Sequence, residues 1–202
     1  MTKEYFTEAV YKYFPRGINE ISHLQDYMAS TEFIALSNKC HEEELRKKNG
    51  DFDRFYKEIE SLDTLKNFYD FTLFHQNDRA HNLQLGELIG TKHYSICLYV
   101  SIIIPYYVIY VLETDVSHAL AEPVDFLRPG YKEPKRSHEM EMYYKPLMDQ
   151  MGDVAKKYFH AQQFPEELVH TIIPDISYQA IPFGEFTFFN AFFHESYYYF
   201  RL

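Results

Sequence analysis

The stretch HYSICLYVSIIIPYYVIYVL, residues 93–112, decides the fold. It contains no Asp, Glu, Lys or Arg, and no other part of the chain is apolar for as long. Twenty uncharged residues are enough to cross a bilayer as a helix. Eight of them, however, are Val or Ile and five are Tyr, which favour strands, and Pro105 lies near the centre, where it would break a helix. The stretch therefore predicts two buried strands, at about 93–103 and 106–113, joined at Ile104-Pro105, with a membrane segment as the alternative.

The strand before Pro105 divides its side chains between two faces. One face is apolar and the other is smaller and more polar: Tyr94, Ile96, Leu98, Val100 and Ile102 against Ser95, Cys97, Tyr99 and Ser101. Residues 79–88 are expected to form a further strand, which turns through Ile89-Gly90-Thr91 into the strand that begins at His93. The centre of the chain is therefore predicted to be a three-stranded antiparallel meander.

Helical patterns occupy the N-terminal part of the chain. Apolar stripes at helical spacing predict helices over residues 3–14, from Ser22 to Lys48, and from Asp51 or Asp53 onward. Ser22 and Gln25 have the spacing of a capping box. These helices precede the meander, so the N-terminal half is expected to be mainly helical.

The C-terminal part mixes a long loop, a helix and strands. Residues 114–136 are expected to form the loop, and a helix follows Ser137, which Pro146 should split or kink. The remaining apolar runs read as strands: 168–173, EFTFFNAFF at 185–193, and 196–201. The whole chain, 1–202, is predicted to be one α+β domain with a helical N-terminal half, a central antiparallel hairpin or meander, and a further helix and C-terminal strands in one mixed sheet.

The chain carries a formal net charge of −10. An acidic protein repels the phosphate backbone, so direct nucleic-acid binding is not expected, whereas a basic partner protein would be attracted. Cys40 and Cys97 are too few for a disulfide framework or a metal motif, which favours a reducing compartment. The N-terminus has no apolar signal core, so we expect a cytoplasmic protein.

The sequence offers no motif for catalysis or for a cofactor. It contains no HExxH, CxxC or GxSxG pattern and no glycine-rich phosphate loop, so neither a metal nor an organic cofactor is expected. A dyad of Cys97 with a histidine stays open, because catalytic groups meet in space rather than in sequence. The alternative to a non-catalytic protein is therefore a small soluble enzyme whose site is assembled from dispersed His, Glu and Tyr residues.

Three stretches resemble bacterial immunity proteins of polymorphic toxin systems, the cognate inhibitors that are encoded beside contact-delivered or secreted toxins. They are YKYFPRGI at 11–18, Tyr27-x-x-Ser30-x-Glu32 with Leu36 on the following helix, and PDISYQAIPFGEFTFFNAFF at 174–193. The strand pair around IIPYYVIY is also similar. The resemblance implies a small cytoplasmic protein without catalysis that binds one cognate toxin domain and blocks its active site.

Acidic and aromatic residues are the candidate contacts for such a toxin. An acidic, tyrosine-rich protein suits a basic partner of the nuclease type, because opposite fields speed association. The candidate residues lie in the loop after the meander, at the start of the following helix and near the C-terminus: Glu113, Asp115, Glu122, Asp125, Glu139, Glu141, Tyr197 and Tyr199. The sequence does not indicate an oligomeric state.

Overall fold

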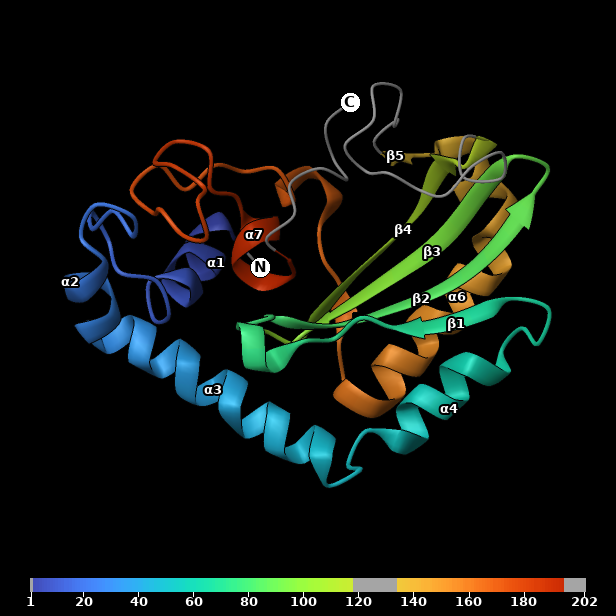
Figure 1. Ribbon diagram of the computed structural model, residues 1–202, viewed down its shortest axis with the longest axis horizontal. Coiled ribbons are helices and arrows are strands. Elements are labelled where there is room, and N and C mark those ends of the chain that lie inside the picture. Colours follow the sequence, from blue (N-terminus) through green and yellow to red (C-terminus); the bar gives the residue numbers. More distant parts are fainter. Residues whose placement is uncertain (1, 118–133, 195–202) are drawn as a thin grey trace.

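The computed structural model describes residues 2–117 and 134–194 (Figure 1). The fold is α+β, as predicted, with six helices and one six-stranded sheet in the described residues. The helices are α1 (Lys3–Val10), α2 (Leu24–Ala29), α3 (Thr31–Lys48), α4 (Asp53–Ser61), α6 (His138–Phe159) and α7 (Phe188–Phe192). The strands are β1 (Asn67–Asp70), β2 (Ala80–Ile89), β3 (Lys92–Ser101), β4 (Tyr106–Asp115), β5 (Lys135–Arg136) and β6 (Gln162–Gln163). Two short 3₁₀ turns, η1 (Phe74–Gln76) and η2 (Glu166–Leu168), join them.

The predicted meander forms the centre of the sheet. β3 and β4 pair antiparallel from Lys92↔Asp115 to Val100↔Tyr107, and β2 pairs with β3 through a turn in which Gly90 has a φ of 63°. Such a two-residue hairpin turn needs positive φ, which glycine adopts without strain. Strands run in the order β1-β2-β3-β4-β5, all antiparallel, and β6 adds to β4 in parallel. The sheet is therefore mixed, and the hairpin prediction is confirmed.

The two faces of the sheet carry two separate apolar cores (Figure 1). The face with Ile96 and Leu98 packs under α4 and α6. The face with Cys97 and Tyr99 packs against α1 and α7. Alternation along β3 thus sends successive side chains into different cores, which is why both faces of this strand are apolar enough to resemble a membrane segment. Within the described ranges no helix is both long and apolar enough to cross a membrane.

The helix predicted from Ser22 to Lys48 is broken at Ser30 into α2 and α3. The Ser30 hydroxyl donates to the Tyr27 carbonyl at 2.7 Å and accepts from the Phe33 N–H at 3.2 Å, so it caps α3. The predicted capping box at Ser22 was wrong, because the Ser22 hydroxyl donates instead to the side chain of Asn19 at 3.1 Å.

Pro146 does not split α6, contrary to that part of the prediction. A proline inside a helix costs about 3 kcal/mol. Tyr144 on one side of it, and Met151 and Val154 on the other, are buried against the sheet. Full burial of an apolar side chain contributes roughly 1.5–3 kcal/mol. Packing on both sides of the proline therefore offsets its cost, and the helix stays continuous.

Two predicted C-terminal strands are wrong. EFTFFNAFF contains α7, which begins with a capping box: Thr187 accepts from the Asn190 N–H, and Asn190 accepts from the Thr187 N–H at 2.9 Å. Leu168 ends η2, and residues 169–173 form a turn and irregular chain with Ile172 in an isolated bridge. Continuous apolar runs have no period that separates a buried helix from a strand, which explains both errors. The strand expected at 196–201 lies outside the described residues.

Candidate functional site

Glu113 and Asp115, two of the predicted contact residues, lie at the end of β4. The Glu113 carboxylate is 2.8 Å from the Lys92 ammonium on β3 and 3.6 Å from the Lys135 ammonium on β5. Burial alone would raise the pKa of Glu113, but these two ammonium groups hold it below its ordinary value. Asp115 accepts a hydrogen bond of 3.0 Å from the N–H of Ser117. The charge of Glu113 is therefore balanced within the chain.

Glu139 and Glu141 lie in the first turn of α6, where the helix dipole favours acidic side chains. The Glu141 carboxylate is 2.6 Å from Arg136 Nε and 3.0 Å from the His138 ring. Glu139 is exposed. The structure thus brings Glu141 and Glu113 to neighbouring cations of β5. The remaining predicted contacts lie outside the described residues and stay predictions: Glu122, Asp125, Tyr197 and Tyr199.

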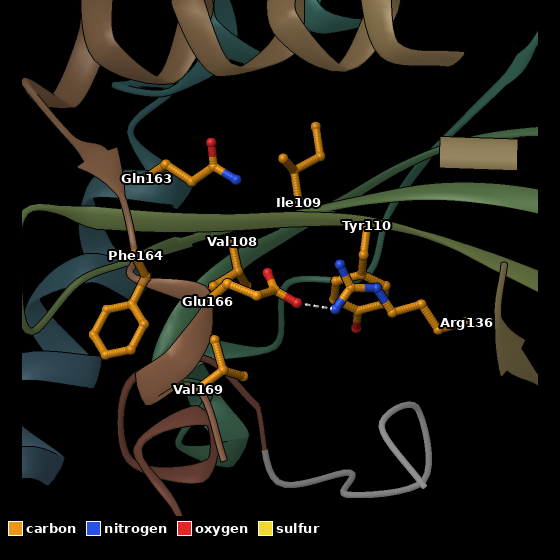
Figure 2. Close-up of a pocket in the computed structure, with 8 residues that line it drawn as sticks. All are labelled: Val108, Ile109, Tyr110, Arg136, Gln163, Phe164, Glu166 and Val169. Atoms are coloured by element: carbon orange, nitrogen blue, oxygen red, sulfur yellow. Dashed lines mark hydrogen bonds and ion pairs between the residues drawn. The ribbon is translucent and has the colours of Figure 1, made fainter. Parts of the chain in front are cut away.

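Arg136 also closes a small cavity between β4 and the segment that follows α6 (Figure 2). Its guanidinium pairs with Glu166 as well as with Glu141. The cavity holds about 10 Å³, close to the space that one water molecule needs. It is too small for a substrate, so Arg136 holds β5, α6 and η2 together here. The other residues that line it are Val108, Ile109, Tyr110, Gln163, Phe164 and Val169.

A larger cleft of about 360 Å³ lies on the face of the sheet that carries Ser95. That volume is within the range of small-ligand sites. Asp78, at its edge, accepts from the Leu73 N–H at 2.6 Å, and burial lowers the pKa of His194 to about 4, so this imidazole is neutral at pH 7. The cleft therefore offers mainly neutral donors and acceptors. Its other described lining residues are Phe71, Gln76, Asn82, Gln84, Leu112, Thr114 and Pro134.

Ser95, in the wall of this cleft, pairs with a histidine. The Ser95 hydroxyl lies 3.3 Å from Nδ1 of His93, and burial lowers the pKa of His93. Nucleophilic catalysis also needs a group that orients the histidine and donors for the oxyanion. In the described part of the chain no carboxylate is hydrogen-bonded to His93. The pair is the nearest approach to a catalytic arrangement, and sequence reasoning missed it, because residues i and i+2 of a strand give no distinctive motif.

His81 is a completely buried titratable group on β2. Its ring is 0% exposed, and its Nδ1 lies 3.0 Å from the Tyr56 hydroxyl. Burial lowers its pKa to about 3, so the imidazole is neutral. Five aromatic rings surround it with centroids 4.5 to 5.9 Å away: Phe52, Phe55, Tyr56, Phe74 and Phe159. Among the residues that the structure describes, no three His, Cys, Asp or Glu side chains converge as metal ligands.

Asp175 joins two of the stretches that carry the family resemblance. Its carboxylate accepts from the Tyr11 hydroxyl at 3.0 Å and from Arg16 Nε at 2.7 Å. Its carbonyl accepts from the N–H of Gly17 at 2.8 Å. The Arg16 guanidinium also lies over the Tyr11 ring, 4.3 Å from its centroid. Residues 164 positions apart in sequence are therefore held in one hydrogen-bonded unit.

Tyr178 joins all three stretches. The Tyr27 ring stacks on it at 5.9 Å with planes 14° apart, and the Phe14 ring meets its edge at 5.3 Å. Phe186 packs on Phe14 at 5.2 Å. These four rings are at most 1% exposed. We call the unit formed by Tyr11, Phe14, Arg16, Tyr27, Asp175, Tyr178 and Phe186 the terminal cluster. The motifs that carry the resemblance thus maintain the fold.

Comparison of the chain with protein-family models, with curated proteins and with solved structures found no match.

Proposed function

We propose that this protein is an immunity protein, which binds a cognate bacterial toxin domain in the cytoplasm and blocks its active site without catalysis. The terminal cluster carries the proposal. The stretches that resemble immunity proteins are far apart in sequence, yet the polar contacts of Asp175 and the buried ring of Tyr178 join them in one unit. The three stretches therefore form one structural unit rather than three separate motifs, and this supports the proposal.

The charge of the chain supports a basic toxin. A formal net charge of −10 attracts a basic domain at long range and raises its association rate. Toxins that cleave nucleic acids need basic surfaces to bind the phosphate backbone. A nuclease-type toxin is therefore the partner that we infer. An acidic inhibitor would compete directly with such a toxin's substrate.

The Ser95–His93 pair favours a second candidate, a small hydrolase that uses the cleft on the sheet. Ser95 would be the nucleophile and His93 its base, with the substrate in the cleft of about 360 Å³. This candidate makes Ser95 indispensable, whereas the inhibitor proposal gives its hydroxyl no part in protection. A Ser95→Ala variant therefore separates the two.

Co-expression tests the proposal. The toxin domain encoded by the adjacent gene should arrest growth when expressed alone, and this chain should restore growth when produced with it. Ser95→Ala should restore growth as well as the unaltered chain does. Failure of rescue with both proteins present at normal levels would contradict the proposal, and rescue that depends on Ser95 would support the hydrolase instead.

A further inference from the structure

Three large apolar side chains are exposed on α2 and on the turn that precedes it. Ile21, Leu24 and Met28 are 71%, 51% and 54% exposed. They are three and four residues apart, a spacing that places them on one side of a helical turn. Figure 1 shows α2 at the edge of the molecule beside the start of α3. We call Ile21, Leu24 and Met28 the α2 stripe.

The chain holds the α2 stripe in a fixed position. Tyr27 lies between its members in sequence but is 1% exposed, because its ring is anchored on Tyr178 in the terminal cluster and on Phe33. The side chain of Asn19 accepts from the N–H of Ile21 at 3.0 Å, which fixes the turn before α2. A preformed surface loses little conformational entropy on binding. The stripe is therefore presented ready to dock.

Acidic residues that form no ion pair within the described residues lie next to the stripe in sequence. Glu20, Asp26 and Glu32 lie within residues 17–38, a segment that contains no Lys or Arg. In the described structure none of the three carboxylates pairs with a cation, in contrast to Glu113 and Glu141. An apolar stripe within an acidic segment is complementary to a basic protein surface that has an apolar groove.

We propose that the α2 stripe is the centre of the surface that binds the toxin domain, with Glu20, Asp26 and Glu32 facing basic groups around the toxin's groove. This inference rests on the proposed function and identifies the surface of the chain that would bind the toxin. Anchor residues at the centre of an interface carry most of its binding energy. The Tyr27-x-x-Ser30 motif then has a structural role in this surface. Tyr27 anchors α2 on the terminal cluster, and Ser30 ends the helix.

The test uses the full chain and the toxin domain encoded by the adjacent gene, in an inactive form. The stripe variant combines Ile21→Ser, Leu24→Ser and Met28→Ser. The matched control combines Leu88→Ser, Met142→Ser and Tyr143→Ser, three residues that are 51%, 74% and 69% exposed. The stripe variant should raise the Kd at least about 100-fold, and the control less than about 3-fold. Melting temperatures of both should stay within about 4 °C of the unaltered chain, because exposed positions contribute little to stability.

A second variant removes the acidic charges and leaves the apolar side chains of the stripe in place. Glu20→Gln, Asp26→Asn and Glu32→Gln together should lower the association rate about 10-fold at low salt and flatten its dependence on salt. If the stripe and charge variants bind as tightly and as fast as the unaltered chain, the surface is wrong although the proposed function stands. If the unaltered chain itself does not bind the toxin domain, the proposed function fails and the surface with it.

Discussion

Protonation of His81 should make this fold sensitive to acid. The ring is buried and neutral with a pKa of about 3, whereas an unfolded chain would return it to 6.5. As the pH falls below 6.5, His81 becomes protonated in the unfolded state, whereas in the folded state it stays neutral until about pH 3. The contribution to folding is therefore fully present above pH 6.5 and is lost as the pH falls through this window.

The magnitude follows from the width of the window. Each pH unit inside it is worth about 1.4 kcal/mol, so His81 alone should remove about 2 kcal/mol of unfolding free energy between pH 6.5 and about pH 4.5. His81→Asn removes the titration and keeps a polar partner for Tyr56. Urea unfolding followed by far-UV circular dichroism, repeated at several pH values, measures the difference.

The exposed His75 provides the matched control, as His75→Asn. The control and the unaltered chain should lose about 2 kcal/mol more than His81→Asn over the same pH range. His194, whose pKa burial lowers to about 4, is present in all three proteins and cancels in the comparison. Parallel pH curves for His81→Asn and the unaltered chain would refute the reasoning.

Three further substitutions test the packing. Asp175→Ala should cost about 1–3 kcal/mol in urea unfolding, because the Tyr11 hydroxyl and the Arg16 guanidinium lose their acceptor, whereas the exposed Asp153→Ala should cost under about 0.5 kcal/mol. Thr187→Ala should cost about 1 kcal/mol by removing the α7 cap and Thr187→Ser should restore it, so equal stability of the two variants would contradict the capping role. Gly152→Ala should lower the melting temperature despite alanine's helix propensity, since its Cβ would lie 2.6 Å from the hydroxyl of the buried Tyr107; a rise in melting temperature would show that the contact relaxes freely.

The central hairpin was predictable because its signals are local. Val and Ile content, alternation and Pro105 all pointed to strands, and Gly90 marked the turn that joins β2 to β3. The α7 helix was not predictable in the same way. Its five residues are all buried, so the apolar pattern lost its period, and the capping box has Asn190 where the usual signal has Glu or Gln.

The candidate site was less predictable than the fold. Glu113 and Glu141 were chosen for their charge, but the cations that balance them come from β3 and β5, and sequence does not show which strands are neighbours. The α2 stripe was hidden for a related reason. Leu24 and Met28 share the helical spacing of core residues with Tyr27, so their sequence does not distinguish them from a buried side chain. The break at Ser30 turns the short helix so that Tyr27 is buried and its apolar neighbours face solvent.

A toxin inhibition titration tests the central claim most directly. The purified toxin domain from the adjacent gene is assayed on its own substrate while the full chain is added in increasing amounts. The account predicts that activity falls to zero at a fixed stoichiometric ratio, and that the α2 stripe variant shifts the curve to higher concentration whereas Ser95→Ala does not. Full toxin activity in the presence of excess chain would contradict the account.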